Sequence, residues 1–292
     1  MAISIFAKRA FLNTKPSQPF EYDGTKPARG YLKRLSSTVR GEQIAQAIGA
    51  KFNPKSGYQD DVCIYIKPVL DENGDFKFEG KSSYLDICDN IKFVELVKKH
   101  LELSVIAASE WNYELLKRLL PNTKIVLIPQ QHCNYERKKR VRKEITVVGA
   151  IGSWGILGDL PADLESRLHE RGMKFIEFSQ FFTREDVIDF YMQIDVQIIW
   201  RPSKDYGRDI LMNSLKLQNS ASFGIPTICY DEPVFKEMDG CYIPVKTLDE
   251  FFGQLDKLRS NPDLYDQYSK KCLEKAEEFH IEKIGELYKS LT

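Results

Sequence analysis

A polar helix followed directly by a buried strand is the feature of this sequence most able to carry chemistry. The segment NSLKLQNSASFGIPTI (213–228) reads as a helix, a glycine turn and an apolar strand. At helical spacing, Lys216, Asn219 and Ser220 share one face. An ammonium group binds phosphate, and an amide one turn further along can bond two neighbouring hydroxyl groups. The segment therefore predicts an anion site next to a hydroxyl-binding side chain.

The start of this predicted helix strengthens the anion site. Asn213 or Ser214 is placed as the N-cap, beside free backbone N–H groups and the positive end of the helix dipole. The preceding loop, RPSKDYGRDILM, adds three more cations, which are Arg201, Lys204 and Arg208. Several convergent donors of this kind favour a phosphate or diphosphate group as the ligand.

Together these residues carry a family resemblance. KLQNSASFGIPTI is similar to the donor-site signature of GT-B glycosyltransferases, in the retaining branch that uses nucleotide-sugars. The resemblance implies that Lys216 binds the donor phosphate and that Asn219 stands where an acidic residue holds the nucleotide ribose. Gly224 and Pro226 match the family's turn. The sequence departs from the family at Asn219 and at Leu211, where the family has a second acidic residue.

A glycine-rich loop is the second element of the resemblance. VVGAIGSWG (147–155) is similar to the first strand and loop of the family's C-terminal domain. Small residues there let backbone N–H groups approach a diphosphate, and Gly152 and Ser153 occupy the matching positions. SSTVRGEQIAQAIGA and VIAASEWNYELLKRLLPNTKIVLIPQQHCN resemble the first helix and the end of the family's N-terminal domain.

Three side chains in the N-terminal half are candidates for the acceptor side. His132 follows the last strand of that half, as a structural histidine or as a residue facing the cleft. Asp86 ends a strand, where ligands of parallel sheets bind. Arg40 precedes a helix at the same edge and is either a solvent-exposed charge or a contact for a phosphate or an acidic acceptor. His132 is also, with Lys216 and Arg201, a candidate for the chemical step.

Composition limits the classes of partner. The 292 residues contain 42 Lys+Arg and 42 Asp+Glu, so no net charge draws the chain to nucleic acid or to an anionic membrane. The six cysteines form no CxxC pair, which favours buried free thiols in the cytoplasm and no metal site. No apolar run is long enough to cross a bilayer. The basic run NYERKKRVRKE (134–144) is a solvated linker or a patch for phosphate, membrane or nucleic acid.

Apolar runs alternate with amphipathic segments in both halves. This alternation predicts an α/β protein with two Rossmann-like, doubly wound parallel-sheet domains facing across a cleft. The expected organisation is an N-terminal acceptor-side domain over 1–133, a basic linker over 134–144 and a C-terminal nucleotide-sugar domain over 145–292. The predicted strands cover 3–7, 62–67, 84–88, 104–109, 124–129, 145–152, 174–179, 196–200, 226–230 and 241–245. The predicted helical segments cover 39–50, 90–100, 110–120, 161–172, 183–194, 213–224, 248–260 and 262–291. The last of these segments is a candidate to pack back on the N-terminal domain.

The resemblance and the predicted sites together favour a glycosyltransferase. It would move a sugar from a UDP- or GDP-sugar to a hydroxyl acceptor such as a saccharide, without a metal or other cofactor and with retention at the anomeric carbon. Two alternatives stay open. One is a degenerate module that binds a nucleotide or sugar without transfer, and the other is a glycosyltransferase acting on modified DNA bases.

Overall fold

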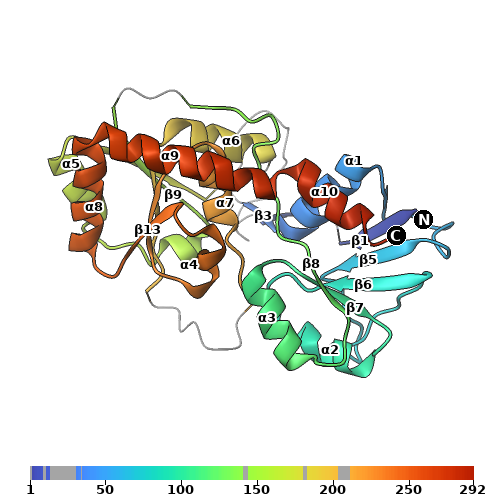
Figure 1. Cartoon of the computed structure of the whole chain (residues 1–292). Coiled ribbons are helices and arrows are strands. Elements are labelled where there is room, and N and C mark those ends of the chain that lie inside the picture. Colours follow the sequence, from blue (N-terminus) through green and yellow to red (C-terminus); the bar gives the residue numbers. More distant parts are fainter. Residues whose placement is uncertain are drawn as a thin grey trace.

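Two parallel sheets, each covered by helices, make up the molecule (Figure 1). The computed structural model describes residues 2–8, 11–13, 31–33, 35–140, 144–179, 183–202 and 211–292. The N-terminal sheet has the strand order β4-β1-β5-β6-β7-β8, and the C-terminal sheet has the order β10-β9-β11-β12-β13. We call these sheets with their helices the N-terminal unit and the C-terminal unit. Their separate parallel sheets confirm the predicted fold class.

The strands follow the apolar runs of the sequence. The N-terminal sheet contains β1 (Ile3–Ala7), β4 (Lys51–Phe52), β5 (Val62–Ile66), β6 (Ser82–Asp86), β7 (Ser104–Ala107) and β8 (Ile125–Leu127). The C-terminal sheet contains β9 (Val147–Ile151), β10 (Lys174–Phe178), β11 (Val196–Ile199), β12 (Thr227–Tyr230) and β13 (Tyr242–Val245). Three short strands were not predicted: β4, β2 (Phe11–Asn13) and β3 (Tyr31–Lys33), the last two forming an antiparallel pair. Runs of two or three residues are too short to show a hydrophobic period.

The helices connect and cover the two sheets. The N-terminal half contains the π-helical turn η1 (Ser37–Glu42), α1 (Gln43–Ile48), α2 (Phe93–Lys99) and α3 (Glu110–Leu119). The C-terminal half contains α4 (Trp154–Leu157), α5 (Leu164–Glu170), α6 (Arg184–Gln193), α7 (Leu215–Ser222), the 3₁₀ turn η2 (Pro233–Met238) and α8 (Leu248–Ser260). The last predicted helical segment is three elements, which are α9 (Pro262–Ala276), η3 (Glu277–Phe279) and α10 (Ile281–Lys289).

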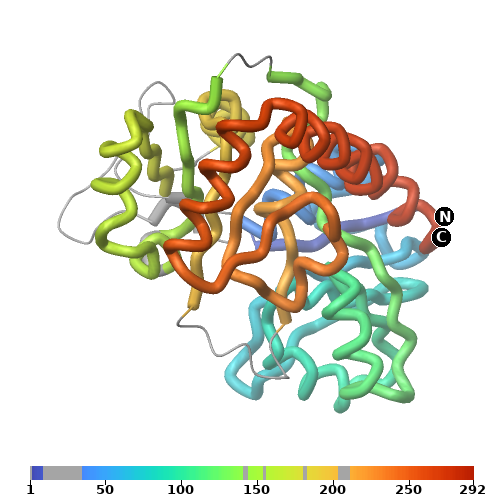
Figure 2. The backbone as a smooth tube through the Cα atoms, turned by 60° about the vertical axis from the view of Figure 1, so that its left-hand side comes forward, coloured from blue at the N-terminus to red at the C-terminus, as the bar shows by residue number. Residues whose placement is uncertain are grey.

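The break before α10 lets the chain return to the N-terminal unit. His280 has an extended backbone (φ −68°, ψ 144°), and its side chain accepts a hydrogen bond from the N–H of Glu282 at the start of α10. Beyond this break, Ile284 and Tyr288 pack into the same hydrophobic cluster as Ile44 of α1. Figures 1 and 2 show α9 over the C-terminal unit and α10 on the N-terminal unit, where both chain termini lie. The chain therefore passes between the units twice.

A glycine in the central part of the C-terminal sheet marks a close approach between strand and helix. A Cβ added to Gly149 of β9 would overlap Cγ2 of Ile194 and lie 3.0 Å from Cζ of Phe190. We expect Gly149→Ala to lower the free energy of unfolding by about 1–3 kcal/mol, because overpacking forces side chains out of their rotamers. Urea denaturation measures this change.

Gly253 of α8 offers the matched control. An added Cβ there meets no atom within 4 Å, and alanine is the better helix former by roughly 1 kcal/mol. Gly253→Ala should therefore leave stability unchanged or raise it. Equal effects of the two substitutions would contradict the close packing of β9 on α6.

Candidate functional site

Helix α7 has the predicted position and C-terminal end, but its N-terminal cap differs from the prediction. Gly224 has φ +67°, as a left-handed helix end requires. Ser214 precedes the first helical residue but makes no capping hydrogen bond, because its hydroxyl group donates to the Glu237 carboxylate instead. Asn213 accepts a hydrogen bond from the N–H of Leu215 at 3.3 Å. The prediction that the Ser214 side chain caps α7 is therefore wrong. The Asn213 side chain accepts the N–H of Leu215 instead.

The lysine of α7 lies against the glycine-rich loop. A Cβ added to Gly152 would lie 3.0 Å from Nζ of Lys216, which is half-buried. The Gly152 N–H donates to Phe178 O at 3.1 Å. The carbonyl group of Ser153 accepts the N–H groups of Ile156 and Leu157, at 2.8 and 3.0 Å. The fold thus brings together two predicted donor-binding segments that are more than 60 residues apart in the sequence.

The other two predicted donor-binding side chains of α7 are buried. Asn219 is 7% exposed, and its Oδ1 accepts the backbone N–H of Cys133 at 2.8 Å. The Ser220 hydroxyl group lies in the interior, donates to Leu217 O at 3.0 Å and is 2.8 Å from Oγ1 of Thr227. Asn219 therefore binds the backbone at Cys133, in the segment that joins the two units, and Ser220 links α7 to β12.

Arg201 stands at the end of β11 and forms an ion pair within the C-terminal unit. Its Nε donates to Oε1 of Glu232 at 2.7 Å, and its Nη2 donates to the other carboxylate oxygen. Glu232 is fully buried and Arg201 is only 15% exposed. The predicted catalytic arginine is therefore held by a carboxylate that the sequence analysis did not single out. Lys204 and Arg208 lie outside the described residues.

Arg40 and Asp86, two predicted acceptor-side residues, are paired inside the N-terminal unit. Nε of Arg40 is 2.6 Å from Oδ2 of Asp86, and both side chains are 0% exposed. Nη2 of Arg40 donates to Ile128 O at 3.0 Å, and the Tyr288 hydroxyl group donates to Asp86 at 3.4 Å. Burial alone would lower the pKa of Arg40, but Asp86 and its other neighbours outweigh burial and raise it, so the guanidinium group stays charged. The interpretation of Arg40 as a solvent-exposed charge is wrong.

His132, the third acceptor-side candidate, is a buried neutral imidazole between the two units. It is 2% exposed, and its Nδ1 accepts the N–H of Asn134 at 3.1 Å. Burial, with the nearby His280 and Arg137, lowers the pKa of His132 to about 3. Because Nδ1 accepts a hydrogen bond, Nε2 carries the proton of the neutral ring.

This lowered pKa predicts an acid-sensitive stability. The unfolded chain binds a proton at His132 below pH ~6.5, whereas the folded chain resists protonation down to about pH 3. Between these values the unfolded state binds more protons, so stability falls as the pH falls. From pH 7 to pH 5 the His132 contribution should fall by about 2 kcal/mol. Urea denaturation of the wild type and His132→Gln at both pH values measures it, with the exposed His169→Gln as control. An unchanged pH dependence in His132→Gln would contradict the buried neutral state.

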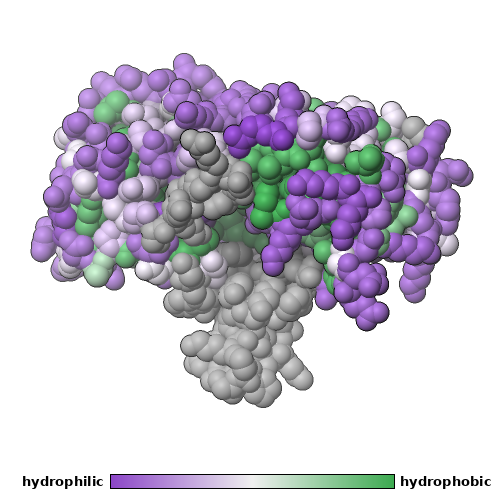
Figure 3. Space-filling view, turned by 90° about the horizontal axis from the view of Figure 1, so that it is seen from below, coloured by the Kyte–Doolittle hydropathy of each residue, from purple (hydrophilic) through white to green (hydrophobic). Residues whose placement is uncertain are grey.

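A small pocket of about 70 Å³ lies where the two units meet. Its walls come from η1 and α1, from the segment after β8, and from α6 and α7; they include Val39, Gln43, Gln131, His132, Arg184, Val187, Leu215 and Asn219. Most of its lining is apolar. Figure 3, a view from below, also shows apolar residues near the middle of the molecule. Side chains of both units thus form one pocket that contains two of the predicted site residues.

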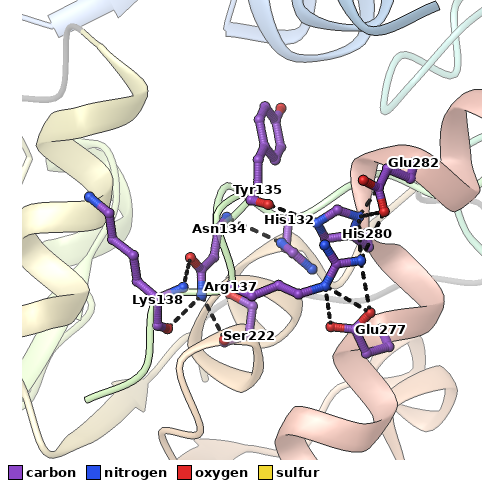
Figure 4. A network of polar contacts seen from close by, with 9 residues as sticks. All are labelled: His132, Asn134, Tyr135, Arg137, Lys138, Ser222, Glu277, His280 and Glu282. Atoms are coloured by element: carbon purple, nitrogen blue, oxygen red, sulfur yellow. Dashed lines mark hydrogen bonds and ion pairs between the residues drawn. The ribbon is translucent and has the colours of Figure 1, made fainter.

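The first half of the basic run is held by ion pairs. Arg137 lies 3.1 Å from Glu277 and 2.9 Å from Glu282, on either side of the break before α10 (Figure 4). Arg140 lies 2.8 Å from Asp195. Residues 141–143 lie outside the described part of the chain. The described arginines of this run therefore join the segment to the C-terminal helices and to the turn between α6 and β11.

Comparison with solved structures identifies the fold. A TarM variant of S. aureus, in a complex with fondaparinux, alpha-GlcNAc-glycerol and UDP, aligns with 80% of this chain and 55% of its own (TM-score 0.56, 14% identity). A trehalose-6-phosphate synthase, studied for glycosyl transfer with retention, aligns with 80% of this chain and 74% of its own (TM-score 0.53, 9% identity). A chain from the structure of accessory secretory proteins 1, 2 and 3 of Streptococcus pneumoniae aligns with 91% of this chain and 61% of its own (TM-score 0.50, 10% identity).

The chain has the GT-B fold, the two-domain fold of the glycosyltransferases among its structural neighbours. It spans about 55% and 61% of the length of the TarM and accessory secretory protein chains. No protein-family model and no curated protein matches the sequence. Within the described residues, no helix has the length and apolar character needed to span a bilayer.

Proposed function

We propose that this protein transfers a sugar from a nucleotide-sugar to a hydroxyl acceptor. The observation that carries the proposal is the proximity of Lys216 Nζ to Gly152. Gly152 follows β9, and ligands of doubly wound sheets bind at the carboxyl ends of the strands. A cation beside a glycine loop suits a diphosphate, and the GT-B neighbours include one with UDP.

The chemical problem in this reaction is the charge of the leaving group. Breaking the sugar–phosphate bond gives oxocarbenium character to the sugar and leaves a nucleoside diphosphate, UDP or GDP in this proposal. Preorganised donors stabilise that charge best in a site that excludes water. Lys216 supplies such a donor without a metal, and the reaction would proceed with retention. On the acceptor side His132 lines the pocket between the units, while Arg40 and Asp86 support the wall behind it.

A thermal-shift screen with UDP, GDP, ADP, CDP and their sugars tests this proposal. A ligand at a hundred times its Kd stabilises the folded protein by about 2.7 kcal/mol. We expect one diphosphate and its sugars to shift the melting temperature, and the same sugar-nucleotide to be turned over when saccharide acceptors are added. Absence of any shift across the panel would contradict a nucleotide-sugar site. The free cysteines favour the cytoplasm as the location.

Binding without transfer is a second candidate function. Asn219 replaces an acidic residue of the family and is held by the Cys133 N–H, Arg201 is held by Glu232, and Leu211 replaces a further acidic residue. These occupied or replaced groups favour a degenerate site. A nucleotide-sugar that binds but is neither hydrolysed nor transferred would support this candidate. For DNA as acceptor, the ion pairs of Arg137 and Arg140 leave little support.

A further inference from the structure

The two units meet at a second interface, far along the chain from the segment that joins them. Ser109 caps α3 of the N-terminal unit, and its hydroxyl group donates to Met212 O at 2.7 Å. Asn112 of the same helix accepts the Met212 N–H at 2.7 Å and donates to Cys88 O at 2.8 Å. Leu211 is 3% exposed and packs in the hydrophobic cluster of α2 and α3. The segment just before α7 is therefore bound to the N-terminal unit.

One buried carboxylate lies at the centre of this interface. Glu237 of η2 is 7% exposed. Its Oε2 accepts the N–H of Glu110, the first residue of α3, at 3.0 Å. Its Oε1 accepts the hydroxyl group of Ser214, the residue directly before α7. A single side chain thus accepts hydrogen bonds from the N-terminal ends of two helices, one in each unit.

Burial raises the pKa of Glu237, whereas the hydrogen bonds from the Ser214 hydroxyl group and the Glu110 N–H act in the opposite direction and favour the charged carboxylate. Lys275 also favours the charged form of Glu237, although its ammonium group is paired with Glu278 at 2.7 Å. A carboxylate is favoured at the N-terminal end of a helix, where backbone N–H groups are free. If α3 and α7 moved apart, Glu237 would stay buried with fewer donors, and burying an unpaired charge is costly.

We propose that Glu237 is a positioning residue that fixes the start of α7, and with it Lys216, against the N-terminal unit. Its effect on the donor phosphate rests on the proposed function. If the two units moved apart at this interface, the contacts at Met212 and Glu237 would break. The geometry of the phosphate site therefore depends on α3, although α3 contributes no residue to that site.

Amide hydrogen exchange combined with nucleotide binding tests this inference. Glu237→Gln keeps the shape but loses the charge. Glu237→Ala also leaves the Glu110 N–H, the Ser214 hydroxyl group and the Gln218 side-chain amide without their acceptor. Charge-assisted hydrogen bonds are about twice as strong as neutral ones. We expect exchange of the Glu110 amide and of residues 213–217 to become about 10-fold faster, and UDP or GDP to bind at least about 5-fold more weakly. Glu274→Gln, an exposed change on α9, should alter neither.

The outcomes separate this inference from the proposed function. Faster exchange confined to α3 and the start of α7, with unchanged exchange in β10 and weaker nucleotide binding, supports the inference. Unchanged exchange in 213–217, or unchanged nucleotide affinity despite faster exchange, overturns the positioning role. If the wild type binds neither nucleotide, the proposed function fails, and exchange at 213–217 alone decides whether Glu237 fixes α7.

Discussion

Replacing Lys216 by alanine is expected to remove most of the stabilisation that a nucleoside diphosphate gives to the folded protein. The loss of one hydrogen bond to a charged group, about 1.5–3 kcal/mol, weakens binding roughly 10- to 150-fold. At a ligand concentration that stabilises the wild type by about 2.7 kcal/mol, the variant should gain only about 0.3–1.4 kcal/mol. If transfer is detected, removing this donor should also lower kcat by about 10²–10³.

The free protein should tolerate this substitution. Lys216 is half-buried at the edge of the glycine-rich loop, and the helical core of α7 is formed by other side chains such as Leu217 and Ala221. Lys236→Ala is the matched control, because Lys236 is an exposed lysine of the same unit. A full ligand shift in Lys216→Ala, or an equal loss in both variants, would place the phosphate away from α7.

Most elements of the fold, apart from the short strands β2, β3 and β4, were predictable because each has a signal in neighbouring residues. β5, β7, β9, β11 and β12 are nearly continuous apolar runs, as strands buried on both faces require. The glycine and proline after α7 predicted its end, and Gly224 has the left-handed backbone expected there. The resemblance to the GT-B donor site implied a shared phosphate site for Lys216 and Gly152, and a Cβ added to Gly152 would lie 3.0 Å from Nζ of Lys216.

The partners of the polar side chains were not predictable in the same way. Arg40 and Asp86 are 46 residues apart, Asn219 and Cys133 are 86 apart, and Glu237 and Glu110 are 127 apart. Each pair depends on how helices and strands pack in three dimensions, and a spacing pattern does not report such packing. The buried carboxylates of Glu232 and Glu237 were therefore missed. Charged residues in loops are usually exposed, and no local signal marked these as buried.

Breaking the buried ion pair of the N-terminal unit is expected to have the largest effect on stability. Among the described residues, Arg40→Met leaves the buried Asp86 carboxylate with the Tyr288 hydroxyl group and the Cys88 N–H and Sγ as donors. Removing one partner of a buried ion pair typically costs about 3–5 kcal/mol, because an uncompensated charge remains in the interior. Urea denaturation at pH 7 should show this loss. The control Lys98→Met removes the ion-pair partner of Glu95 on the surface, and it should lower the free energy of unfolding by about 0–1 kcal/mol.

The double variant Arg40→Met/Asp86→Leu separates a structural role from a role in acceptor binding. Hydrophobic replacement of a whole buried ion pair is often neutral or stabilising, so the double variant should be more stable than Arg40→Met alone. It should also keep its nucleotide shift, because Lys216 and Gly152 lie in the other unit. A small stability loss in Arg40→Met, together with weaker acceptor binding, would instead show that the guanidinium group reaches the ligand. The zero exposure of Arg40 and Asp86 leads us to expect the first result, in which the pair holds η1 and β6 in place behind the pocket.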